Sequence, residues 1–249
     1  MCAESKLWGE VRRYMRAKSG CKGGQGTSQL SQHFHRCYGF DVSAAQIQEA
    51  KASHHEDNTR YEVCGAESMP SIASNSVQLV TAFESAQYFV WNSFVDECTR
   101  VLVDGAVVAV IGYWLPDPID PSHPSDRSLI DLMDSCYNDT RLTPYKSPKA
   151  TIQLVVDHYR DVKFPSNYEF LHIDNIVGPQ TVVAHDMVGL VESWSAYQAL
   201  RRADKDTADS MSRDISDKLM DILKTTDLSA KEIVFNYTYF IAMARKLHN

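Results

Sequence analysis

Short apolar runs alternate with segments of helical periodicity in the first half of the chain. Four runs have the length and composition of strands: residues 37–40, 60–64, 76–82 and 106–112. The last of them, AVVAVIG, is apolar throughout, as central parallel strands are. Between the runs, residues 44–53 and 91–102 place apolar side chains three and four apart, and Ser43 is a suitable N-cap. This alternation predicts an α/β fold with a doubly wound, mostly parallel sheet.

The pattern changes at Tyr113. A proline-rich loop comes first, and helical periodicity or strand-like runs follow at residues 128–137, 150–159, 168–173, 186–202 and 207–224. From residue 231 an alternating and then apolar run predicts a closing antiparallel strand. We therefore expect one domain over residues 1–249, divided into a cofactor-binding half (1–112), acceptor-side insertions with a helical lid (113–230), and a closing strand (231–249). Residues 1–17 predict a further helix.

Composition narrows the possible functions. The chain has 249 residues, 44% of them hydrophobic, and a formal net charge of −7 without any basic block. Such a chain has no electrostatic attraction for a nucleic acid backbone. Its six cysteines form no CxxC pair, and His33 with His35, or His54 with His55, lack the second cluster that a metal site needs. No stretch approaches the ~20 apolar residues of a membrane span. We expect a cytoplasmic monomer that binds neither metal, nucleic acid nor membrane.

A glycine-rich turn at residues 23–26 precedes a helix-like segment, and Asp41 ends the first apolar run after it. Glycines allow a ligand to approach the backbone closely, and a carboxylate at a strand tip can accept ribose hydroxyls. Together they predict half of a nucleoside-binding crevice. The alternative is a tight turn followed by a solvated acid, because short motifs of this kind often occur by chance.

Several further stretches follow this turn in a fixed order. They are GQGTSQL (24–30), GFDVSAAQIQEAK (39–51), YEVCGAESMP (61–70), SVQLVTAFESAQYF (76–89), RVLVDGAVVAVIGYW (100–114), SWSAYQ (193–198) and VFNYTYFIAMARK (234–246). In this order they resemble class I S-adenosylmethionine-dependent methyltransferases, and most of all the small-molecule branch that contains trans-aconitate methyltransferase. The likeness covers nearly the whole chain.

The resemblance implies S-adenosyl-L-methionine as the cofactor and a role for each matching residue. Gly24 and Gly26 would pass close to its methionine part, and Asp41 would accept the ribose hydroxyls. The residues expected beside the adenine are Val42, Ala66 and Glu67. The segment 83–87, which begins with Phe83, would lie under the methionyl end and the reactive methyl. The alternatives are a core position for Val42 and a solvated acid for Glu67.

The resemblance also implies a small-molecule methyl acceptor, methylated on a carboxylate or another oxygen. The residues expected to bind it are Gln87, Tyr88, Tyr113, Trp114, Trp194 and Tyr197. Core packing is the alternative for the aromatic ones, above all at the helical spacing of Trp194 and Tyr197. Methyl transfer from a sulfonium is an in-line displacement, which needs alignment more than a base. We therefore assign no catalytic residue.

One departure from the family concerns the first strand. Family members carry an apolar strand that ends in an acid before a motif such as GCGSGQGT, whereas this chain reads YMRAKSGCKGGQGT. One register places Lys18 where the acid belongs. The other, which we favour, takes residues 14–23 as a helix and loop and leaves the first strand missing, because a central strand tolerates few charges.

A missing strand would favour an alternative function, a catalytically impaired relative or splice form that acts through protein contacts. A nicotinamide-dependent oxidoreductase is a third possibility. It is disfavoured because the chain lacks GxGxxG and Asp41 comes earlier than the ~20-residue spacing of that fold.

Overall fold

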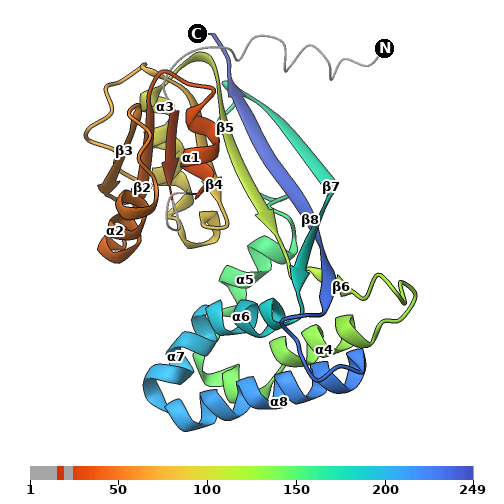
Figure 1. Ribbon diagram of the computed structural model, residues 1–249. Coiled ribbons are helices and arrows are strands. Elements are labelled where there is room, and N and C mark those ends of the chain that lie inside the picture. The colour runs from red at the N-terminus through yellow and green to blue at the C-terminus, as the bar shows by residue number, and fades with distance from the viewer. Residues whose placement is uncertain (1–15, 20–24, 249) are drawn as a thin grey trace. The chain divides into compact units, whose positions relative to one another are not determined.

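A computed structural model describes residues 16–19 and 25–248 (Figure 1). By their contacts these residues fall into two compact units. The first unit comprises the described residues up to Gly112, together with Leu154–Asp174 and the chain from Phe240 onward. The second comprises Tyr113–Gln153 and Asn175–Tyr239. Each unit is described by itself below.

Eight strands occur in the described part of the chain. They are β1 (Arg16–Ser19), β2 (Cys37–Asp41), β3 (Thr59–Val63), β4 (Val77–Phe83), β5 (Leu102–Tyr113), β6 (Asp117–Ile119), β7 (Tyr168–Val183) and β8 (Glu232–Lys246). In the first unit the order is β3-β2-β1-β4-β5, all parallel, with β8 beside β5 and β7 paired to β8. In the second unit β6 pairs antiparallel with β8. The predicted doubly wound, mostly parallel α/β sheet is confirmed.

The first strand is present, so the prediction that it is missing was wrong. β1 lies between β2 and β4 and pairs parallel with both, Arg16 being opposite Cys37 on one side and Leu79 on the other. The hydrogen bonds between strands are made by backbone N–H and C=O groups, so a short segment with charged side chains can still form a central strand. Without β1, the facing edges of β2 and β4 would lack these bonds. The strand agrees with the register that puts Lys18 near the first strand's end. Of the predicted helix at 1–17, residues 16 and 17 belong to β1 and the others lie outside the described residues.

Among the described residues of the first unit, the helices that accompany the strands are α1 (Gln25–Ser31), α2 (Ala44–Ser53), α3 (Trp91–Val101) and the short 3₁₀ helix η3 (Ala86–Tyr88). Ser43 caps α2 as predicted, because its hydroxyl accepts a hydrogen bond from the Gln46 N–H. The apolar face of α3 is buried, and so are the central strands, where Val80 and Val108 are wholly inaccessible to solvent.

Lys246, at the end of β8, is a buried cation that joins β8 to the end of α3. Its ammonium donates to the carbonyls of Thr99 at 3.0 Å and Leu102 at 2.8 Å, and to Asn75 Oδ1 at 3.3 Å. Carbonyl groups at a helix C-terminus carry partial negative charge and lack partners within the helix. The lysine supplies both the partners and the compensating charge.

The second unit is mainly helical. It contains α4 (Ser128–Tyr137), η4 (Thr140–Tyr145), the start of α5 (Lys149–Val156), α6 (His185–Ser193), α7 (Ser195–Ala203) and α8 (Lys205–Leu223). The single helix predicted at 186–202 is two helices. The backbone of Trp194 is extended, with ψ at 141°, and interrupts the helical hydrogen bonds. The helices share one apolar core, to which Met187, Met211 and Leu219 contribute fully buried side chains. No described helix has the length and apolar character to cross a bilayer.

Candidate functional site

The carboxyl end of β2 presents an acid and an exposed apolar side chain. Asp41 is the last residue of β2, and its Oδ1 accepts a hydrogen bond of 2.9 Å from the Ser43 N–H, which fixes the carboxylate at the strand tip. Val42, between them, is 77% exposed. It does not belong to the core, which was the alternative for this residue.

The turn after β3 is tied to the start of α3. Ala66 is buried at 3% exposure, and Glu67 Oε1 accepts from the Val90 N–H at 2.9 Å. Glu67 therefore holds the turn and is not simply a solvated acid. The same turn is fixed further along by Arg100, which donates to the Met69 carbonyl at 3.0 Å. Glu97 accepts a hydrogen bond from Arg100. This bond lowers the pKa of Glu97 below its usual value, although burial acts in the opposite direction.

The segment after β4 carries three more predicted residues. Phe83 ends β4, and Glu84 follows with a left-handed φ of 51°. In η3, Tyr88 is 60% exposed, whereas Gln87 is half-buried and accepts a hydrogen bond of 2.6 Å from the Tyr159 hydroxyl. Sequence reasoning placed Tyr159 at the end of a helix over 150–159, but α5 ends at Val156, and the contact with Gln87 joins residues 72 apart in sequence.

Of the two predicted glycines, Gly24 lies outside the described residues and Gly26 lies half-buried in α1. The next residue, Thr27, is fully buried, and its Oγ1 has no hydrogen-bond partner among the described residues. It lies close to Gly39 of β2, where a Cβ would come within 3.1 Å of the Thr27 hydroxyl. A Cβ there would come even closer, 2.5 Å, to the Tyr61 ring, so glycine at residue 39 makes room for that ring as well as for α1.

Aromatic side chains gather in the second unit, and we call Tyr113, Trp114, Tyr137, Trp194, Tyr237 and Tyr239 the aromatic group. The Tyr113 ring lies edge-on to Tyr237 and Tyr239, at centroid distances of 4.9 and 5.5 Å. Tyr137 lies edge-on to Trp114 at 5.1 Å and to Trp194 at 5.9 Å. Lys146 adds a cation, its Nζ being 4.3 Å from the centre of the Tyr137 ring.

Tyr197 does not join this group. It is 1% exposed within the helical core, and its hydroxyl bonds to the Ala208 carbonyl and to Ser212. Core packing, the alternative reading, describes it better than a role in binding. Tyr137, Tyr237 and Tyr239 were not predicted. The spacing of Tyr237 and Tyr239 along an alternating strand places both on one face of β8, a signal that could have found them.

The predicted residues are thus divided between the units. At or just after the carboxyl ends of β2, β3 and β4 in the first unit lie the predicted residues Asp41, Val42, Ala66, Glu67, Phe83, Gln87 and Tyr88. This is the edge at which open α/β sheets bind ligands. Tyr113, Trp114 and Trp194 lie in the second unit.

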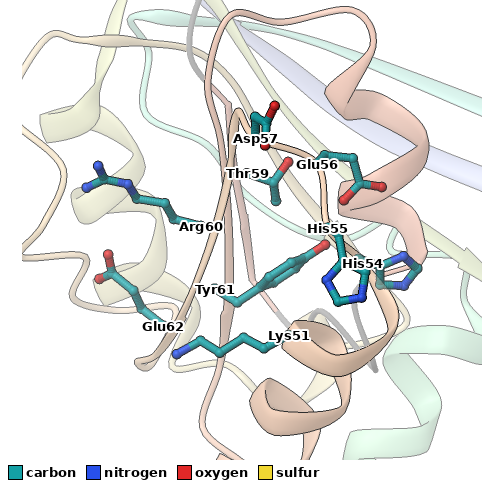
Figure 2. A pocket seen from close by; sticks show the side chains of 9 residues that line it. All are labelled: Lys51, His54, His55, Glu56, Asp57, Thr59, Arg60, Tyr61 and Glu62. Carbon is teal, nitrogen blue, oxygen red and sulfur yellow. The ribbon is translucent and has the colours of Figure 1, made fainter.

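An open depression lies at the opposite end of β3. Figure 2 shows its lining: Lys51, His54, His55, Glu56, Asp57, Thr59, Arg60, Tyr61 and Glu62. These residues come from the end of α2, the loop after it and the strand itself, and their charges are of both signs. None of them is a predicted site residue. The described residues hold no group of three or more histidine, cysteine or acidic side chains placed to bind a metal.

Comparison with known proteins agrees with this arrangement. Residues 17–110 match the family model of a methyltransferase domain. A Dictyostelium discoideum protein, provisionally named a methyltransferase, is 28% identical over 228 residues, which are 91% of this chain and 80% of that protein.

Two solved structures share the fold. One, from Anaeromyxobacter dehalogenans and provisionally named a type II methyltransferase, has a TM-score of 0.74 at 23% identity and covers 95% of this chain and 92% of its own. The YcgJ protein of Bacillus subtilis has a TM-score of 0.51 at 15% identity and covers 99% and 98%.

Proposed function

We propose that the chain is a class I S-adenosylmethionine-dependent methyltransferase and that it methylates an oxygen of a small-molecule acceptor, most simply a carboxylate. The observation that carries the cofactor half of this proposal is the tip of β2. There an oriented carboxylate, Asp41, stands beside the exposed apolar side chain of Val42.

The residues at this edge suit the cofactor. Asp41 would accept the ribose hydroxyls, because a carboxylate at the tip of a parallel strand suits paired hydroxyl donors. Val42 and Val63, 77% and 56% exposed at the ends of neighbouring strands, offer apolar surface to a planar base. Ala66 and Glu67 would border the same base. Their turn is fixed by the hydrogen bond between Glu67 and the Val90 N–H. Gly24, Gly26 and Phe83 would border the methionine part.

When bound, S-adenosylmethionine supplies a methyl group activated by its positive sulfur. A carboxylate acceptor already carries the attacking electron pair, so the bond to oxygen forms as the bond to sulfur breaks, and no proton has to be removed. The protein then needs to align the two groups and exclude water, not to provide a base.

The second unit supports a carboxylate acceptor. Tyr113, Trp114 and Trp194 would bind its apolar part, and Lys146 at the aromatic group would pair with its charge. No ion pair of Lys146 occurs among the described residues, so its ammonium keeps donors for a ligand. Gln87 and Tyr88 are the proposed acceptor residues on the first unit.

A methyl-transfer assay tests this proposal. The chain is incubated with S-adenosylmethionine and either benzoate or hexanoate, with benzamide and hexanamide as matched neutral controls, and methyl esters are measured by mass spectrometry. We expect esters from the acids and no product from the amides. Lys146→Gln should weaken the acid's apparent affinity by about 1.5–3 kcal/mol, the scale of a hydrogen bond to a charged group.

The control for that variant is Lys149→Gln, which removes the same charge from an exposed lysine nearby in sequence. Failure of both acids to yield an ester would reject the carboxylate acceptor. Equal effects of the two lysine variants would reject the role of Lys146.

Other expectations about the protein stay proposals. The alternative of a catalytically impaired relative was based on a missing first strand. It loses this support, because β1 lies between β2 and β4. We retain a cytoplasmic monomer without nucleic acid or membrane partners. Its support is the net charge of −7 and the buried free thiols of Cys98 and Cys136.

A further inference from the structure

We infer that Tyr159 is a positioning residue for Gln87, whose side-chain amide it orients so that the NH₂ group is presented to an oxygen of the methyl acceptor. This inference rests on the proposed function. It adds a residue that no motif indicates, and it narrows the acceptor to groups that can receive a hydrogen bond.

The contact between the two side chains is short and protected from solvent. The Tyr159 hydroxyl donates to Gln87 Oε1 at 2.6 Å, and Tyr159 is only 1% exposed. Its ring lies at 64° to Phe240, with centroids 5.5 Å apart. Gly112, near the end of β5, makes room for both rings, since a Cβ there would lie 3.0 Å from Tyr159 and 2.4 Å from Phe240.

The backbone that carries Tyr159 is held in an unfavourable conformation. His158 and Tyr159 both have φ of 55°, in the left-handed region that residues with a side chain seldom occupy. Two such residues in succession persist only where their surroundings determine them, and strain of this kind gathers at functional sites.

Neighbouring strands provide those surroundings. His158 Nδ1 donates to Asp174 Oδ1 of β7 at 2.7 Å, and the His158 ring stacks on Phe240 of β8 at 4.4 Å. His172 Nε2 donates to the His158 carbonyl at 2.7 Å. Arg160 pairs with the other oxygen of Asp174. The segment that delivers Tyr159 is therefore fixed at its backbone and on both sides in sequence.

The consequence for Gln87 follows from the chemistry of an amide. A glutamine side chain has one oxygen that accepts and one nitrogen that donates two hydrogen bonds. The oxygen is engaged by Tyr159, and the nitrogen makes one long contact of 3.4 Å to the Glu84 carbonyl. The other N–H is then directed away from Tyr159 and suits an oxygen with lone pairs. A protonated amine, which has none, would be disfavoured.

The test has a structural readout that does not depend on catalysis. In the ¹⁵N-labelled full chain, the side-chain amide signals of Gln87 are identified by their loss in Gln87→Ala. Tyr159→Phe keeps the ring and removes the hydroxyl, so we expect those signals to move toward the position of solvent-exposed glutamines. Tyr168→Phe is the matched control, because Tyr168 is a buried tyrosine of the same unit whose hydroxyl bonds to Thr99.

Unchanged Gln87 signals in Tyr159→Phe, or an equal shift in Tyr168→Phe, would overturn the inference. Kinetics with benzoate give a second readout. Tyr159→Phe should raise the KM for benzoate roughly fivefold, the effect of one lost hydrogen bond, with the affinity for S-adenosylmethionine unchanged. Loss of affinity for both ligands would indicate a structural role only. An inactive wild-type chain would count against the proposed function and leave the amide signals to decide the role of Tyr159.

Discussion

Asp41 has a structural role, which its hydrogen bond shows, and a proposed role in binding the cofactor. Its hydrogen bond to the Ser43 N–H orients the carboxylate, and the same Ser43 caps α2, so the strand tip and the helix start form one fixed unit. Val42 stays exposed because the residues on either side of it are held by these bonds. The acid could be predicted from sequence, since it ends an apolar run. For Val42 the residue pattern alone favoured a core position, and only the resemblance, which places it beside the adenine, predicted an accessible side chain.

Replacing Asp41 with alanine should weaken S-adenosylmethionine binding by about 1–3 kcal/mol, because paired polar groups lose their hydrogen bonds. Isothermal titration calorimetry measures this change. Asp57→Ala is the control, since it removes one exposed acid from the same unit at the other end of the sheet. Equal affinities of wild type and Asp41→Ala would reject the ribose role.

Elements differ in how far their sequence determines them. α4 begins and ends where periodicity predicts, and α2 does so too, because caps and apolar spacing are local signals. β1 was missed because its pairing uses backbone groups, which its charged side chains do not reveal. The break between α6 and α7 was missed as well, because the apolar spacing continues across Trp194 although the backbone of Trp194 is extended, not helical.

Hydrogen-bond partners that lie far apart in sequence could not be predicted, because only the folded topology brings them together. Tyr159 reaches Gln87, and Lys231 reaches Asp120 over 111 residues, through the topology alone. The Ser122 N–H and the Lys231 ammonium, 2.9 and 3.1 Å from Asp120, join the loop after β6 to the residue before β8. Burial by itself would raise the pKa of Asp120, but these donors prevail and lower it to about 2.

Asp120→Asn tests this link between elements. Because the folded-state pKa is lowered from its usual value near 4, the ionised acid stabilises the fold fully above that pH, and this contribution disappears as pH falls toward 2. We expect the variant to lose about 2 kcal/mol at pH 7, and the difference from wild type to shrink below pH 4.

Urea unfolding at a series of pH values measures that difference, with Asp117→Asn as the exposed control. A gap between variant and wild type that stays constant from pH 7 to pH 3 would contradict the assigned ionisation.

At the scale of the whole molecule, the parallel strands and the match to a methyltransferase domain coincide in the first unit. The order of its strands brings residues from separate parts of the chain to one edge of the sheet, after β2, β3 and β4. The second unit holds the aromatic group, and Lys146 lies over the ring of its Tyr137. Under the proposed function, the first unit would bind the cofactor and residues of the aromatic group would bind the acceptor.

The central claim is that this chain, with its short charged first strand, binds the methyl donor. Calorimetric titration of the full chain with S-adenosylmethionine tests it most directly, and S-adenosylhomocysteine serves as the product ligand. The account predicts saturable binding of both ligands with one site per chain. Absence of measurable heat, and of any rise in melting temperature, at millimolar ligand would contradict it.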